Sequence, residues 1–145
     1  MKSAVLLVFA AACAAGAVGT AAARSEATPT VTVRASQYGR IVFDGRARVL
    51  YAFTRDRRGG KSTCYGACAR AWPPYIVRGA LRAGGGTRQG LLGTVRRRDG
   101  KRQLTYRGRP LYYYVGDGRD EVKCQNVDEF GGVWLVLRGD GRLVR

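Results

Sequence analysis

The side chains of this sequence that are best suited to chemistry are the thiols of three cysteines. Cys64 and Cys68 are separated by three residues, and Cys124 follows much later in the chain. Thiols can form a structural disulfide, act as a redox pair, or bind copper(I) or zinc as thiolates. The Cys-x-x-x-Cys spacing is not the Cys-x-x-Cys of thioredoxin, and no His or Lys flanks the pair to lower a thiol pKa. We expect a structural disulfide, with thiol-redox chemistry or a metal site formed by Cys64, Cys68 and Cys124 as the alternative.

The pairing of these cysteines stays open at the level of sequence. Residues four apart in a regular helix have Cβ atoms about 5–6 Å apart, whereas a disulfide needs about 3.8 Å. A Cys64–Cys68 bridge therefore requires an irregular turn, which Gly66 can supply. A bridge from either residue to Cys124 would close a loop of more than about 50 residues and stabilise the fold by about 4 kcal/mol.

The other ionisable residues do not form a recognisable catalytic pattern. The chain contains no His, which excludes Ser-His-Asp triads and His general bases. Asp56 and Asp117 would serve as paired carboxylates only if the fold brought them together, and the sequence does not define their separation. The glycine run at 84–86 is not followed by a helical pattern, so it does not predict a phosphate-binding loop. We expect no catalytic activity and no cofactor.

A motif of the form Leu-Tyr-x-[Phe/Tyr]-x-x-Asp occurs twice, beginning at Leu50 and at Leu111, and each copy is followed by a Trp. Side chains two residues apart in a strand share one face, so each motif places two aromatic rings side by side. The Asp that ends each motif is positioned to cap free backbone N–H groups in a turn. We expect a mainly structural role for these residues: Tyr51, Phe53, Asp56, Trp72, Tyr112, Tyr114, Asp117 and Trp134.

Tyr113 lies between the two aromatic residues of the second motif and points to the opposite face of the predicted strand. It is therefore the residue that we expect to make an exposed contact. An exposed aromatic ring beside an acid is an arrangement that binds sugars.

Between turn signals the chain has the pattern of short strands. Residues 31–34 alternate between polar and apolar, and Asp-Gly pairs at 44–45, 99–100 and 140–141 predict hairpin turns. Residues 64–72 end at two prolines and predict a single short helical segment. With 21 Gly and eight Tyr, the composition favours strands and turns. We expect an all-β fold in which two tandem repeats pack as one small sandwich-like or barrel-like domain.

The N-terminal residues predict export. A short basic start, an apolar run over 4–12 and the Ala21-Ala22-Ala23 site are typical of a signal peptide over residues 1–23. Ala10-Ala11-Ala12-Cys13 matches a lipobox only in part, because Ala10 stands where Leu or Val is usual. We therefore expect secretion to the extracytoplasmic cell envelope rather than lipid anchoring at Cys13, with no transmembrane segment after cleavage.

The rest of the chain divides into three parts. Residues 24–37 form a polar leader that we expect to be partly disordered. Residues 38–145 are long enough for a single all-β domain with one core. Its two repeats span about 38–78 and 92–137, and a Gly/Arg-rich loop joins them.

The chain is strongly basic, with a formal net charge of +16. Such a charge favours a polyanionic partner, or it is a solvated basic surface whose Arg bias follows a G+C-rich genome. The Arg residues are spread through loops and strand ends, and no nucleic-acid-binding motif is present. We expect a solvated surface that makes weak contact with anionic wall polymers or lipid head groups, and no specific nucleic-acid partner. The expected role is non-catalytic binding or scaffolding of an envelope component.

Several linked motifs resemble the bacterial "secreted repeat of unknown function" family, over about Tyr38 to Val136. They are Leu50-Tyr51-x-Phe53-x-x-Asp56, Ser62-x-Cys64-x-Gly66-x-Cys68-Ala69-x-x-Trp72-Pro73-Pro74, Cys124-Gln125-Asn126-Val127 and Phe130-Gly131-Gly132-x-Trp134. Members of that family are described as predicted lipoproteins with a Tyr-x-[Phe/Trp/Tyr]-x-x-Asp motif. The resemblance implies an exported envelope protein made of tandem repeats, and it implies no activity. The partial lipobox at Cys13 is where this chain departs from the family.

Overall fold

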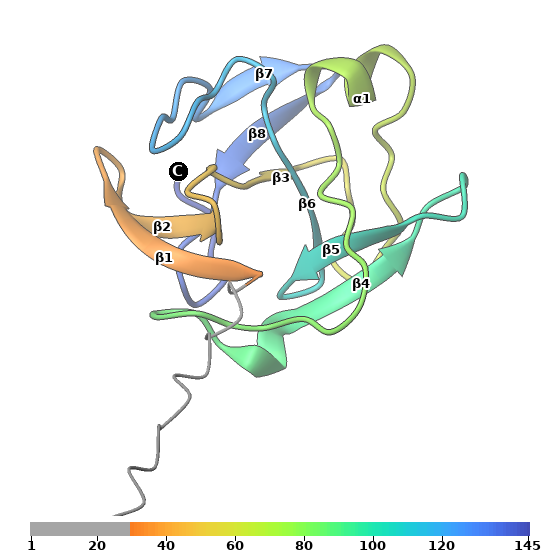
Figure 1. The fold of residues 1–145 in the computed structure, drawn as a ribbon. Coiled ribbons are helices and arrows are strands. Elements are labelled where there is room, and N and C mark those ends of the chain that lie inside the picture. The colour runs from red at the N-terminus through yellow and green to blue at the C-terminus, as the bar shows by residue number, and fades with distance from the viewer. Residues whose placement is uncertain (1–29) are drawn as a thin grey trace, which may run out of the picture.

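The computed structural model describes residues 30–145, and these form two antiparallel sheets with very little helix (Figure 1). One sheet has the strand order β1-β2 and the other β4-β5-β6-β3-β8-β7. The elements are β1 (Val31–Ser36), β2 (Gly39–Asp44), β3 (Tyr51–Phe53), α1 (Ala67–Ala71), η1 (Gln89–Leu91), β4 (Leu92–Arg96), β5 (Arg102–Tyr106), β6 (Arg109–Tyr112), β7 (Val127–Glu129) and β8 (Gly132–Val136). The prediction of an all-β, sandwich-like fold of two repeats is confirmed.

The two repeats meet at the pairing of β3 with β6. Tyr51 lies opposite Tyr112, and Ala52 lies opposite Leu111, in an antiparallel register. Since the two tyrosines occupy the same position of the repeated motif, an approximate twofold axis passes between them. Figure 1 shows the β1–β2 hairpin of the first repeat and the β4–β5 hairpin of the second on either side of this central pair.

Each motif strand is also bordered by a segment of the other repeat that contains, or directly follows, the Trp of that repeat. In the second repeat this neighbour is β8, which pairs with β3 from Trp134 to Val136. In the first repeat it is the segment 73–77, where Pro74 forms an isolated bridge with Tyr112. Pro73 and Pro74 have no N–H to donate, so this segment forms bridges to β5 and β6 without becoming a regular strand.

A stack of tryptophans at the twofold axis forms the centre of the core. The rings of Trp72 and Trp134 are parallel, with centroids 4.0 Å apart, and both are fully buried. Phe53 stacks on the other face of Trp134 at 4.1 Å. Tyr51 meets Trp72 edge-on, and Tyr112 meets Trp134 in the same way. The aromatic residues of both motifs therefore form one shared core, which joins the repeats into a single unit.

The structure changes some boundaries that the sequence predicted. Strand β1 begins at Val31, so the folded domain includes the second half of the range 24–37 assigned to the leader. The helical segment predicted over 64–72 is present but shorter, as α1. The loop between the repeats is partly ordered along β1, where Val31 forms a parallel bridge with Ala83 and the Val33 N–H donates to the Gly85 carbonyl. The predicted signal peptide, Cys13 and residues 24–29 lie outside the described residues.

Candidate anion-binding site

The repeated Tyr and Asp residues are placed in two reciprocal pairs. The Tyr51 hydroxyl donates to Asp117 Oδ2 at 2.7 Å, and the Tyr112 hydroxyl donates to Asp56 Oδ2 at 2.5 Å. Each Tyr therefore bonds to the Asp of the other repeat, as the twofold relation of β3 and β6 requires. We call Tyr51–Asp117 and Tyr112–Asp56 the reciprocal pairs.

Each Asp of the reciprocal pairs also organises the loop that follows its motif. Asp56 Oδ1 accepts from the backbone N–H of Thr63, and Asp117 Oδ1 accepts from that of Lys123. These loops are longer than the local turns that the sequence predicted for the two Asp residues. Both carboxylates are buried and committed to internal hydrogen bonds, so the structure does not support their use as paired catalytic carboxylates.

The pKa values of the buried groups agree with this arrangement. Burial raises the pKa of the Tyr51 hydroxyl well above its usual value, and the adjacent Asp117 raises it further. Burial and Asp56 do the same to the pKa of Tyr112. Burial also raises the pKa of Asp117, against the opposing effect of its hydrogen bond from Tyr51. Both tyrosines therefore stay protonated and act as hydrogen-bond donors.

Arg97 is buried, although Arg96 and Arg98 on either side of it are exposed. Its Nη1 donates to Ser62 Oγ at 2.6 Å and to Gln103 Oε1 at 2.7 Å, and its Nη2 donates to the Cys64 carbonyl at 2.8 Å. Ser62 Oγ is in turn 2.7 Å from the Tyr112 hydroxyl, so Arg97 extends one reciprocal pair. Strand alternation carries the signal that was missed, because Arg97 shares the phase of the inward-facing side chains while Arg96 and Arg98 are exposed.

The structure joins Cys64 to Cys68 in a disulfide with a Cα–Cα distance of 5.3 Å. Gly66, immediately before α1, has φ of 57° and forms the irregular turn that this bridge needs. Cys124 remains a thiol, and its partial burial raises its pKa and so reduces its reactivity. Two of the three thiols of the alternative metal site at Cys64, Cys68 and Cys124 are therefore joined to each other, and residues 30–145 contain no group of three His, Cys, Asp or Glu residues placed to hold a metal ion.

A thiol count follows from this arrangement. In protein purified without its predicted signal peptide, we expect iodoacetamide in denaturant to modify one thiol, that of Cys124, because the other two cysteines are bonded to each other. Reduction before alkylation should raise the number of modified thiols to three. Intact mass spectrometry measures both states. Modification of all three thiols without reductant would contradict the disulfide.

Tyr113 turns away from the tryptophan core, as strand alternation requires, but it is not the exposed contact that the sequence predicted. Its hydroxyl donates to Asp44 Oδ2 at 3.0 Å, and its ring packs on Tyr75 at 5.0 Å. The guanidinium of Arg48 lies 4.6 Å from the ring centroid. The side chain is therefore half-buried and its polar atom is occupied, which disfavours a simple aromatic platform for sugars.

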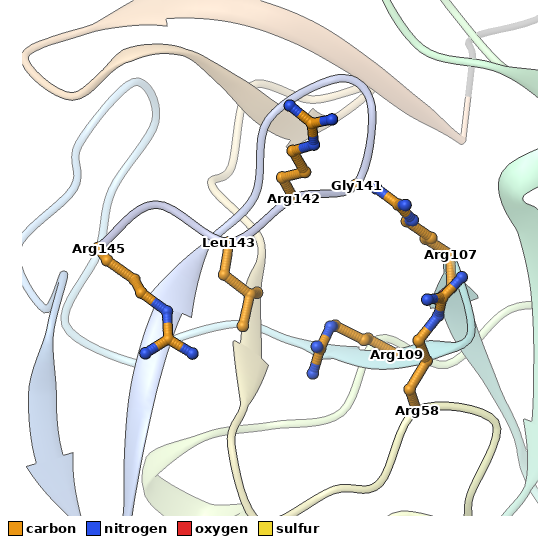
Figure 2. Close-up of a pocket in the computed structure, with 7 residues that line it drawn as sticks. All are labelled: Arg58, Arg107, Arg109, Gly141, Arg142, Leu143 and Arg145. Atoms are coloured by element: carbon orange, nitrogen blue, oxygen red, sulfur yellow. The ribbon is translucent and has the colours of Figure 1, made fainter.

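Five arginines from separate parts of the chain line a cavity, which sequence reasoning missed (Figure 2). Five of the seven residues that line it are arginines, and none is Asp or Glu. Its volume is about 210 Å³. We call it the arginine pocket, and its lining residues are Arg58, Arg107, Arg109, Gly141, Arg142, Leu143 and Arg145.

Backbone carbonyls hold some of these guanidinium groups in place without neutralising them. Arg58 Nε donates to the Arg107 carbonyl at 3.2 Å, and Arg107 Nη1 donates to the Asp140 carbonyl at 3.2 Å. Within residues 30–145, Arg142 is the one arginine of the pocket that forms an ion pair, with Asp140 at 3.3 Å. The other four guanidinium groups of the pocket form no ion pair with a residue of this range.

The pKa of Arg109 shows the repulsion between the guanidinium groups of the arginine pocket. Arg109 begins β6 and is partly buried. Its pKa is lowered, first by burial and then by the positive charges of Arg58, Arg145 and Arg107. Arg58 follows β3, Arg107 and Arg109 flank the turn between β5 and β6, and Arg142 and Arg145 follow β8. The fold thus concentrates charges that are far apart in the sequence, and an anion in the pocket would relieve their repulsion.

Comparison with known proteins supports the two-repeat architecture. A family described as a secreted repeat of unknown function matches residues 32–75 and 93–138. Each matched range contains a hairpin and the motif strand that follows it. No curated protein and no solved structure matches the chain.

The family description agrees with an exported protein. Within residues 30–145, no helix has the length and hydropathy that a membrane span requires. The two family matches together cover more than half of the sequence. The chain therefore belongs to the family of secreted repeats of unknown function.

Proposed function

We propose that this protein is an exported, non-catalytic binding protein of the cell envelope, and that its arginine pocket holds a phosphate group of an anionic envelope component. The observation that carries the proposal is the set of five arginines around a cavity whose lining contains no Asp or Glu. Arginine binds phosphate oxygens through paired N–H donors, and such charge-assisted bonds are among the strongest hydrogen bonds in proteins.

The size of the pocket supports this assignment. A water molecule takes up about 30 Å³ of the liquid, so a cavity of about 210 Å³ has room for a phosphate or sulfate group with its first waters. The net charge of +16 would also attract anions over a longer range. Leu143 is the one apolar side chain of the lining and Gly141 the one glycine, so the pocket offers cationic donors with no base or nucleophile.

Arg109→Gln is the variant that tests the proposal, because it removes a partly buried charge from the pocket. In wild type, phosphate at ten times its Kd should stabilise the fold by about 1.4 kcal/mol, measured against chloride at equal ionic strength by urea denaturation. Loss of one charge-assisted contact should weaken phosphate binding by about tenfold or more. Without phosphate, Arg109→Gln should be at least as stable as wild type, since it relieves repulsion.

Arg40→Gln is the matched control, because Arg40 is exposed on β2 and lies outside the pocket. It removes the same charge from the molecule and should leave phosphate binding unchanged. Equal losses in the two variants would show that phosphate responds only to net charge. Equal stabilisation of wild type by phosphate and chloride would also reject the proposal.

A further inference from the structure

A second cavity lies directly beside the arginine pocket and shares two residues of its wall, Arg58 and Arg107. Its volume is about 560 Å³, so it is larger than the arginine pocket. Four of the nine residues that line it are glycines and two are leucines. The full lining is Arg58, Gly59, Gly90, Leu91, Leu92, Gly93, Thr105, Arg107 and Gly108.

The shared wall is built by contact between two loops. The Gly59 N–H donates to the Gly108 carbonyl at 2.7 Å, next to the bond from Arg58 to the Arg107 carbonyl. Gly108 has φ of 75°, and a Cβ there would lie 3.1 Å from the Gly59 nitrogen. Glycine at this position therefore allows the loops to approach, and their contact holds Arg58 and Arg107 between the two cavities.

Thr105 brings an unpartnered hydroxyl to the second cavity. It lies in β5 and its residue is only 7% exposed. Its Oγ1 takes part in no hydrogen bond within residues 30–145. The one fully enclosed side-chain polar atom of that range without a partner is Arg97 Nε, so the Thr105 oxygen is not fully enclosed and is open to the cavity. Gly93 is its partner across the β4–β5 pair, and a Cβ at Gly93 would lie 2.9 Å from this oxygen. The glycine thus leaves space beside the hydroxyl.

We propose that the two cavities form one site for a phosphate ester of a polyol or sugar. The phosphate occupies the arginine pocket, and the uncharged organic part occupies the second cavity. There it bonds to the Thr105 hydroxyl and packs its C–H groups on Leu91 and Leu92. This inference rests on the proposed function, and it adds that the site recognises the organic part as well as the phosphate.

The glycines of the second cavity leave room for the organic part of the ligand, while the arginines surround the phosphate. A Cβ at Gly90 would meet no atom within 4 Å, so open space remains at that wall for a ligand. Arg58 and Arg107, the charged residues of the second cavity, are both on the side shared with the arginine pocket. A ligand with one charged end and one hydroxyl-bearing end therefore fits the pair of cavities.

Isothermal titration calorimetry with inorganic phosphate and glycerol 1-phosphate tests this inference. Wild type should bind glycerol 1-phosphate about tenfold more tightly than inorganic phosphate, as expected for one or two added hydrogen bonds. Thr105→Val keeps the side-chain shape and strand preference but removes the hydroxyl, so it should lose most of this preference. Thr94→Val is the matched control, because Thr94 is exposed on the neighbouring strand β4, and it should keep the preference.

Gly90→Leu is a second variant, for the case in which Thr105→Val fails to fold. It places a side chain in the open space beside the second cavity and should also reduce the preference for the ester. Equal affinity of wild type for the two probes would overturn the inference while leaving the arginine pocket as a phosphate site. Binding of neither probe would reject the proposed function and this inference together. A preference that survives in both variants would place the organic part elsewhere.

Discussion

Replacement of Trp134 by alanine is expected to destabilise the protein by about 3–5 kcal/mol, the range for removal of a large buried aromatic side chain. Trp134 is fully buried between Trp72 and Phe53, with ring centroids 4.0 and 4.1 Å away. Its Nε1 also donates to the Glu129 carbonyl at 3.2 Å. The variant would lose contacts on both ring faces and leave a cavity where the two repeats meet.

Urea denaturation followed by circular dichroism, with the disulfide intact, measures this loss. Val115→Ala is a suitable control, because Val115 is a large apolar residue that is 57% exposed. Its replacement should change the free energy of unfolding by about 0.5 kcal/mol or less. If Trp134→Ala lowered the free energy of unfolding by only that amount, the two tryptophans would not form the centre of the core.

Replacement of Asp56 by alanine is expected to destabilise the protein by about 2–4 kcal/mol, because it leaves a buried hydroxyl and a backbone N–H without their acceptor. Asp56 is 2% exposed and accepts from the Tyr112 hydroxyl and from the Thr63 N–H. Tyr112→Phe removes only the hydroxyl and should have a smaller effect of about 1 kcal/mol.

A double-mutant cycle between Asp56→Ala and Tyr112→Phe tests whether the reciprocal pair acts as a unit. Groups in direct hydrogen-bond contact usually show a coupling energy of about 0.5–3 kcal/mol. Asp128→Ala is the matched control, since Asp128 is exposed on β7 and should change stability little. Additive effects of the two replacements would show that the motif does not join the repeats through this bond.

The reciprocal pairs explain why the motif requires both a Tyr and an Asp. A single repeat contains both residues, but its Tyr has no Asp at the correct place in its own half. The twofold pairing of β3 with β6 brings in the Asp of the second repeat, and the Trp stack adds a shared core. We therefore interpret the motif as the element that holds two repeats together, which leaves the outer loops free to carry a binding site.

Much of the fold was predictable because it depends on residues close together in the chain. Alternation over 31–34, the Asp-Gly turn at 44–45 and the two motif copies are local patterns, and the structure places strands and turns there. The two prolines after Trp72 end the helical segment for a local reason as well, since proline cannot donate a helical hydrogen bond. The phase of each strand also separated Tyr112 from Tyr113, because neighbouring side chains point to opposite faces.

The partners of these residues depended on the tertiary structure. Asp56 and Asp117 each accept a hydrogen bond from the Tyr of the other repeat. This pairing follows from the antiparallel register of two strands about sixty residues apart. The same packing decided that Arg97 would be buried and that Cys124 would remain a thiol. Strand phase directs Arg97 inward, but the partners of all these residues lie elsewhere in the chain, so no periodic pattern in the sequence identifies those partners.

The sequence by itself determined that this chain is a basic, exported-type protein built from two β-repeats, because composition and strand periodicity are properties of neighbouring residues. Only the tertiary structure decided that five dispersed arginines would surround one cavity and that Thr105 would line a second cavity beside it. The physical reason is that electrostatic repulsion and hydrogen bonding depend on distances in space. Those distances are set when segments far apart in the chain pack together.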